Sequence, residues 1–153
     1  MGIEYNQDSF HKELEMIQTC ITRMGHNSFM VKGWLLSIIA ASMALLPESF
    51  NGWFAIGFLV LVTGAFWYLD AFFLYTEKLY RHKYDWVIKV RYEGNKEYVF
   101  NLNPHKSEMR LEGIIIDSVK DVMFSKTLKA FYGVIFGVLV ILLIAYPFVE
   151  GLI

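Results

Sequence analysis

The fold is decided by residues 52–75, GWFAIGFLVLVTGAFWYLDAFFLY, which carry a single charged side chain, Asp70. A membrane-spanning helix needs about 20 apolar residues, so this stretch predicts a span. Two more apolar runs flank it, residues 33–46 (GWLLSIIAASMALL) and 130–149 (AFYGVIFGVLVILLIAYPFV). The chain is 56% hydrophobic with a mean hydropathy of +0.39, which is too apolar for an ordinary soluble domain. We predict an all-α membrane protein with three transmembrane helices.

The basic residues predict the orientation of these spans. Three of the 14 Lys and Arg residues precede the first run, and the other eleven lie between Lys78 and Lys129. Residues 47–51 and 150–153 carry none. Because Lys and Arg are enriched in cytoplasmic loops, we expect a cytoplasmic N-terminus and a periplasmic C-terminus in a bacterial inner (plasma) membrane.

These patterns divide the chain into four parts. They are a cytoplasmic helical arm (1–27), two spans (28–76), a cytoplasmic segment (77–128), and a third span with a short periplasmic tail (129–153). The first run has only fourteen residues before Pro47. It crosses the bilayer only if Lys32 snorkels and the helix continues through residues 28–31. A re-entrant helix is the alternative.

The arm is predicted to be a helix that begins near Phe10, with Asp8 and Ser9 as N-caps. Its apolar residues recur at spacings of 4, 3, 4 and 3, which is a heptad seam of the kind that pairs helices in an oligomer: Phe10, Leu14, Ile17, Ile21 and Met24. An amphipathic helix that lies on the membrane or on its own cytoplasmic segment fits equally well. Gly25 marks either a hinge or a glycine that faces a neighbouring helix.

The cytoplasmic segment is predicted to contain a small β-hairpin. Apolar and polar residues alternate on both sides of Gly94-Asn95, with apolar residues at Trp86, Ile88, Val90, Tyr92, Tyr98, Phe100 and Leu102. Asp117 is expected to cap a basic amphipathic helix that leads into the third span.

Polar and small residues inside the spans are candidates for a pore lining or for helix packing. A carboxylate in hydrocarbon is costly, so Asp70 lies either at a functional intramembrane site or at the cytoplasmic interface. The pore candidates are Ser37, Ser42, Thr63 and Asp70. Gly133 and Gly137 form a GxxxG motif, which favours close packing of the third span within or between subunits.

The sequence carries no motif for catalysis or metal binding. It lacks HExxH, paired cysteines, GxSxG, a P-loop and GxGxxG, so we expect no enzyme, no cofactor and no metal. By charge alone, the arm offers candidates for binding a phosphate-bearing ligand: Lys12, Arg23, His26 and Lys32. The simpler interpretation makes them solvated charges that set the topology.

Four stretches resemble a family of small bacterial three-span proteins found beside defence genes, the membrane effectors of the Hailong antiphage system. They are residues 17–24 (IQTCITRM), 27–34 (NSFMVKGW), 69–85 (LDAFFLYTEKLYRHKYD) and 123–132 (MFSKTLKAFY). The resemblance implies a homotetrameric ion channel whose N-terminal helices form a central plug. It also implies that short single-stranded DNA, made by a partner nucleotidyltransferase, holds the plug shut. These stretches name no chemistry, so no ligand contact is carried over to a particular residue.

We therefore expect a defence effector that oligomerises, contacts lipid and depolarises the cell when its channel opens. The alternative is a non-conducting membrane scaffold that recruits a cytoplasmic defence enzyme.

Overall fold

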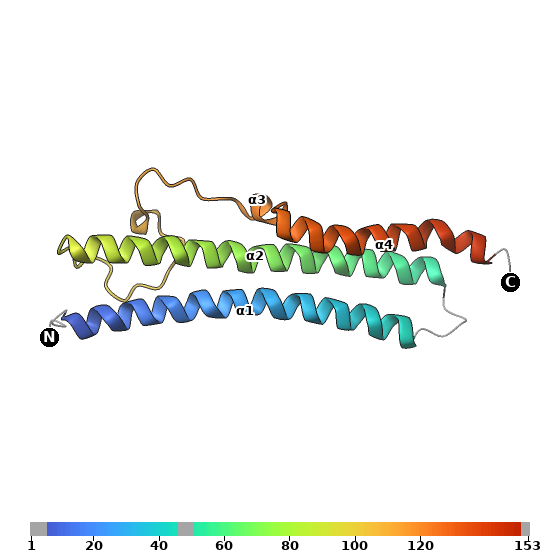
Figure 1. Cartoon of the computed structure of the whole chain (residues 1–153), viewed down its shortest axis with the longest axis horizontal. Coiled ribbons are helices and arrows are strands. Elements are labelled where there is room, and N and C mark those ends of the chain that lie inside the picture. The colour runs from blue at the N-terminus through green and yellow to red at the C-terminus, as the bar shows by residue number, and fades with distance from the viewer. Residues whose placement is uncertain (1–5, 46–50, 151–153) are drawn as a thin grey trace.

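The computed structural model describes residues 6–45 and 51–150. Three long helices lie side by side, and α2 packs against the other two (Figure 1). In chain order the elements are α1 (Gln7–Leu45), α2 (Gly52–Tyr92), the 3-10 helix η1 (Ser107–Met109), α3 (Val119–Met123) and α4 (Lys126–Glu150). Neighbouring long helices run antiparallel. Helix α1 therefore begins at one end of the molecule, where the segment between α2 and α4 also lies, and α4 ends at the other.

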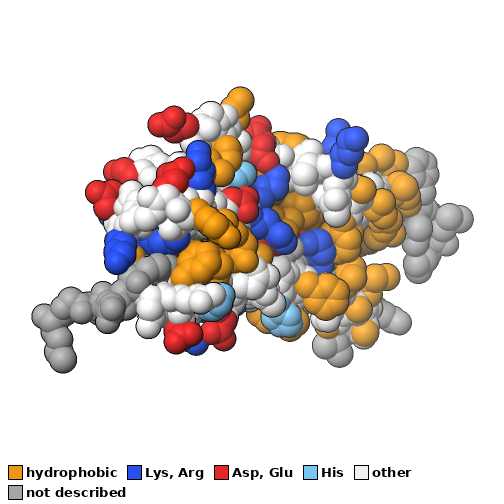
Figure 2. All heavy atoms as spheres, turned by 60° about the vertical axis from the view of Figure 1, so that its left-hand side comes forward, with side chains coloured by type: hydrophobic (Ala, Val, Ile, Leu, Met, Phe, Trp, Pro, Cys, Tyr) orange, Lys and Arg blue, Asp and Glu red, His pale blue; other side chains and the backbone are white. Residues whose placement is uncertain are grey.

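As predicted, three helices, α1, α2 and α4, are each long and apolar enough to cross a membrane. Most charged side chains gather over the end where α1 begins, which we call the charged end, whereas hydrophobic side chains cover the opposite half (Figure 2). The first run gains its length toward the N-terminus, because α1 continues without a break through Gly25 and residues 28–31. Helix α1 begins at Gln7 rather than near Phe10, because the side chain of Asn6 accepts a hydrogen bond from the Ser9 amide at 2.9 Å and so caps the helix there.

The β-hairpin prediction is wrong, because the described residues contain no strand. Residues 84–92 continue α2, and their buried side chains follow a helical spacing at Trp86, Val87 and Val90. The alternation that suggested a strand placed Val87 on the solvent face, yet Val87 is fully buried. Beyond Gly94, Tyr98 and Phe100 have positive φ angles of 56° and 57°, a left-handed conformation that interrupts a strand.

The cap expected at Asp117 is also displaced. Ser118 and Asp121 form a reciprocal capping box that begins α3, whereas Asp117 forms an ion pair with Lys78 of α2. The bonds from Ser118 lower the pKa of the Asp121 carboxyl. The expected amphipathic helix is therefore two helices, because α3 ends at Met123 and α4 starts at Lys126.

Two bonds fix the register of α4 on α2. The Tyr132 hydroxyl donates to the Phe66 carbonyl at 3.3 Å, and the Gly52 amide donates to the Tyr146 hydroxyl at 3.3 Å. Each helix advances 14 residues between these points, which is about 21 Å. By the same count Lys126 is level with Phe72, about 30 Å along α2 from Gly52. That distance equals the hydrocarbon thickness of a bilayer, roughly 30 Å.

Candidate functional site

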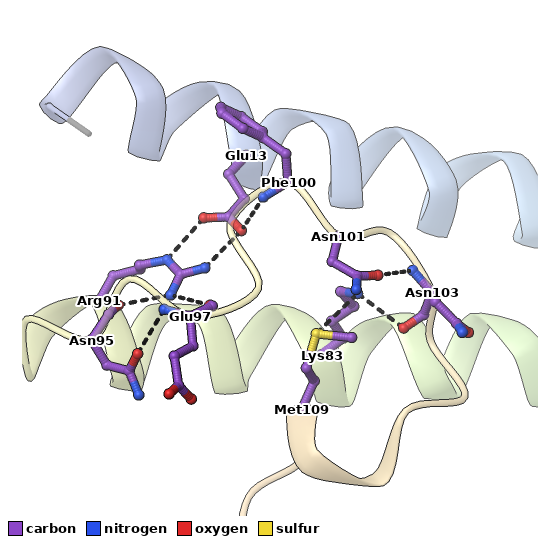
Figure 3. Close-up of polar contacts among 9 residues, drawn as sticks. All are labelled: Glu13, Lys83, Arg91, Asn95, Glu97, Phe100, Asn101, Asn103 and Met109. Carbon is purple, nitrogen blue, oxygen red and sulfur yellow. Dashed lines mark hydrogen bonds and ion pairs between the residues drawn. The ribbon is translucent and has the colours of Figure 1, made fainter. Parts of the chain in front are cut away.

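A buried ion pair fastens the arm to α2 at the charged end (Figure 3). Glu13 of α1 accepts from Arg91 Nε and from Arg91 Nη2, both at 3.0 Å, and the Glu13 and Arg91 side chains are 1% and 3% exposed. The Phe100 amide also donates to Glu13, at 3.0 Å. Arg91 Nη1 donates to the Asn95 and Glu97 carbonyls at 2.7 and 3.0 Å. We call this set the clasp, because it joins α1, α2 and the connecting loop (residues 93–118) at one point.

A buried lysine holds the connecting loop a few turns along α2. Lys83 Nζ donates to the Asn103 carbonyl at 3.0 Å and lies 3.7 Å from the Met109 sulfur (Figure 3). Burial lowers the pKa of Lys83 to about 8, and the nearby Glu13 carboxylate only partly opposes that shift. Burial among neutral hydrogen-bond partners therefore disfavours the ammonium form relative to that of an exposed lysine.

The heptad seam packs inside the protomer. Its residues lie against the extension of α2, with Ile17 and Ile21 buried beside Tyr80, Trp86, Val87 and Val90. Phe10, Leu14 and Met24 pack against the same cluster, which Met109 closes from the connecting loop. The packing of the arm on its own segment, one of the two predicted arrangements, is therefore the arrangement observed. Gly25 faces α2, since a Cβ there would lie 3.2 Å from Glu77 Oε2.

A second polar cluster ties all three long helices together. Asp70 of α2 is fully buried, and its carboxylate accepts from Ser28 Oγ at 2.5 Å and from the Tyr132 hydroxyl at 3.0 Å. Lys32 Nζ lies 2.6 Å from the same carboxylate, and its side chain is 21% exposed. We call these four residues the three-helix node. It neutralises Asp70 inside one protomer, as a buried charge requires.

The node lies close to the membrane boundary. Asp70 is 18 residues beyond Gly52, about 27 Å along the helix, and Lys126 marks the boundary at about 30 Å. With bilayer edges at Gly52 and Lys126, the Asp70 carboxylate would lie about 3 Å, or half a turn, inside the nearer edge, which is compatible with both expected positions. Lys32 reaches it from α1, which explains how a span can begin with a lysine.

The four basic candidates on α1 do not converge. Lys12 pairs with Glu15 at 2.8 Å on the surface, and Lys32 belongs to the node. Arg23 and His26 are exposed and line one open groove of about 550 Å³ together with Glu15, Gln18, Thr19 and Thr22. Only these two therefore share a surface on which a single ligand could contact both.

The pore candidates separate by exposure. Ser37 is exposed on α1, with its hydroxyl donating to the Gly33 carbonyl at 2.9 Å, and Ser42 is half-buried. Thr63 is fully buried, and its hydroxyl has no hydrogen-bond partner within the described part of the chain. Gly133 and Gly137 are exposed, and no described atom lies within 4 Å of a Cβ built on either. Within the described protomer the GxxxG face is therefore uncovered.

Sequence reasoning missed the buried lysine and several members of the clasp and the node: Lys83, Glu13, Arg91, Ser28 and Tyr132. One signal was present. Lys83 shares the helical spacing of Leu79, Trp86 and Val90, so a helix extended through residue 92 would have placed a lysine on a buried face. Over residues 6–45 and 51–150, acidic, histidine and cysteine side chains form no group that could hold a metal ion.

Comparison with protein-family models, with curated proteins and with solved structures finds no match for this chain. The site must therefore be interpreted from its own geometry.

Proposed function

We propose that this protein is an oligomeric channel of the bacterial inner membrane, an effector of antiphage defence whose N-terminal arm controls opening. The observation that supports this most directly is the mismatch between the polarity of α1 and its burial. The most apolar part of α1 has a mean hydropathy of 1.2, compared with 1.8 for α2 and 2.5 for α4, yet it is no more buried in the protomer than theirs, at 17% compared with 22% and 17%.

A span of such low hydropathy is poorly suited to facing lipid on its free side. Its exposed surface in the bilayer includes Gly33 and Ser37, small residues that let helices approach closely. Further copies of α1 would cover this face or enclose water against it. We therefore propose that α1 faces the axis of a homo-oligomer, with a tetramer as the form that the resemblance implies, and that Ser37 lines the pore.

The cytoplasmic half of α1 supports a gate at the same axis. In the proposed orientation the clasp lies in the cytoplasm, with the arm docked directly above the span that would line the pore. A short single-stranded DNA, the ligand that the resemblance implies, would have to bridge arms of several copies. Outside the node, one arm offers few basic side chains, His11, Lys12, Arg23 and His26, and repetition across copies multiplies these contacts.

Planar-bilayer conductance of the purified protein tests the proposal. Wild type should conduct once the arm is released, and Ser37→Leu should lower the unitary conductance by making the lining apolar. Thr127→Leu is the matched control, because Thr127 is an exposed hydroxyl on the first turn of α4 and should leave conductance unchanged.

A folded oligomer that never conducts, with its arm intact or released, would favour the non-conducting scaffold. The scaffold alternative retains one supporting observation. Ile115, in the connecting loop, is 93% exposed, and a large apolar side chain in that position suits contact with a recruited partner.

A further inference from the structure

A cavity of about 310 Å³ lies between α1 and α2 at the level of the membrane boundary, on residues that neither polar cluster uses. It is lined by His26, Asn27, Met30, Val31, Trp34 and Phe73. Its volume falls at the lower end of the range of small-molecule sites. Phe73 is 21 residues beyond Gly52, about 32 Å along α2, so the cavity straddles the boundary placed at about 30 Å.

The polarity of the lining changes along the cavity in the same direction as the bilayer. His26 and Asn27 lie toward the charged end, whereas Trp34 lies two turns further into the span, about 12 Å from His26. Trp34 is 55% exposed, as tryptophans of the interfacial belt are. Apolar side chains therefore line the part in hydrocarbon, and polar side chains line the part at headgroup depth.

The cavity adjoins the polar groove on the arm, and His26 lines both. Arg23 lies one turn beyond His26, is exposed, and brings positive charge to the outer end of the shared groove. We propose that the cavity and the adjoining groove together bind a phospholipid of the leaflet at the charged end. Its acyl chain lies against Met30, Trp34 and Phe73, and its phosphate lies at His26 and Asn27 within the field of Arg23.

A lipid fits this groove better than a second copy of the chain or a nucleic acid does. A partner helix would have to match a groove that is polar at one end and apolar at the other, whereas that gradient is the defining property of a phospholipid. A nucleic acid would leave the apolar half without a matching apolar group. The inference depends on the membrane placement alone and holds whether or not the protein conducts ions.

Lipid retention by the full chain tests the proposal. The protein is purified in mild detergent, and bound phosphatidylglycerol is counted by native mass spectrometry during titration with that lipid. Wild type should retain lipid. The double variant Arg23→Glu/His26→Ala should bind it about tenfold more weakly, as loss of one charged contact implies. Lys96→Glu makes a like charge reversal at an exposed lysine of the connecting loop, outside the cavity and the groove, and should match wild type.

A second measurement uses spectroscopy. Lipids brominated near the headgroup should quench Trp34 in wild type, and titration with unbrominated phosphatidylglycerol should restore its emission. A Trp34→Phe variant identifies this component of the signal. Equal affinities for wild type and the double variant would overturn the proposal, as would copurified oligonucleotide in place of phospholipid. Protection of Trp34 that depends on protein concentration and not on lipid would assign the groove to a second copy.

Discussion

Replacing Glu13 with Gln should release the arm from α2 without disturbing the spans. The change keeps the size of the side chain but removes the negative charge that faces Arg91. Glu13 and Arg91 are both almost fully buried, and removing one partner of a buried pair costs about 3 to 5 kcal/mol. Arg91 keeps its bonds to the Asn95 and Glu97 carbonyls, so we expect about 3 kcal/mol, the lower end of that range.

Hydrogen exchange measures this loss of stability residue by residue along the arm. Each 1.4 kcal/mol is a factor of ten in an equilibrium, so arm amides should exchange roughly a hundredfold faster in Glu13→Gln than in wild type. The Phe100 amide should accelerate with them, because it donates to the same carboxylate. Amides in the membrane half of α4 should be unaffected, since the node is intact.

A double-mutant cycle identifies the pair as the cause. Arg91→Met should loosen the arm by a similar amount, and Glu13→Gln/Arg91→Met should lose clearly less than the sum, because neither charge is then buried alone. The control is Arg81→Met, which breaks the i,i+4 pair of Arg81 with Glu77 on the same helix. Arg81 is 63% exposed, and such a pair contributes less than about 1 kcal/mol. Additive effects, or an Arg81→Met effect as large as that of Glu13→Gln, would refute the clasp.

Three more predictions follow from the other contacts. Asp70→Asn leaves Lys32 without a carboxylate and should lower the free energy of unfolding by about 2 to 3 kcal/mol, a modest loss because the partly exposed Lys32 side chain can turn toward water. Unfolding in denaturing detergent should show that adding Lys32→Met recovers part of this loss. Purely additive losses would count against the node. The folded protein binds fewer protons at Lys83 than the unfolded chain between pH 8 and 10.5, so the contribution of Lys83 to the free energy of unfolding is smallest below pH 8 and increases across that range. Thermal melts should show a smaller increase of stability with pH in Lys83→Met than in wild type. Equal pH dependence in the two proteins would refute the lowered pKa of Lys83. Gly52→Ala places a Cβ 2.2 Å from the Tyr146 ring and should destabilise the contact between α2 and α4 by about 1 to 3 kcal/mol, whereas Gly57→Ala, with open space around it, should be neutral or stabilising in the same melts.

The sequence was most informative where a pattern extends over many residues. Three apolar runs predict three helices, because a span needs a length of apolar residues and not a particular partner. The C-terminal end of α2 was mistaken for a strand because its apolar residues Trp86, Ile88, Val90 and Tyr92 fit a period of two by chance, while its buried residues fit the helical period of 3.6. Over seven residues the two periods are hard to separate, and the choice is made by Ile17 and Ile21, which pack against the helical face from far away in sequence.

The polar clusters were harder to predict for a related reason. Asp70 was visible as a lone charge in an apolar run, yet its partners come from α1 and α4, 42 and 62 residues away. Glu13 carried no signal at all, because a glutamate on a helical arm is normally solvated. Its burial depends on Arg91, 78 residues later in the chain, and on a loop whose path the sequence did not reveal.

The two clusters together limit how α1 could act as a gate. Glu13 and Lys32 are 19 residues apart, about 28 Å on one continuous helix. The node fixes the membrane end of α1 to both other helices, so an opening motion must be confined to the arm.

An arm that leaves α2 exposes Ile17 and Ile21, and each buried side chain of this size is worth about 1.5 to 3 kcal/mol. Added to the cost of breaking the clasp, the cost of exposing these side chains exceeds the free energy that a weak ligand supplies by binding the open state more tightly than the closed state. Opening is far less costly if the exposed seam is buried again at once, and its heptad spacing suits the same seam on neighbouring arms. The proposed gate would then exchange contacts within a protomer for contacts between protomers, and for that reason it requires the oligomer.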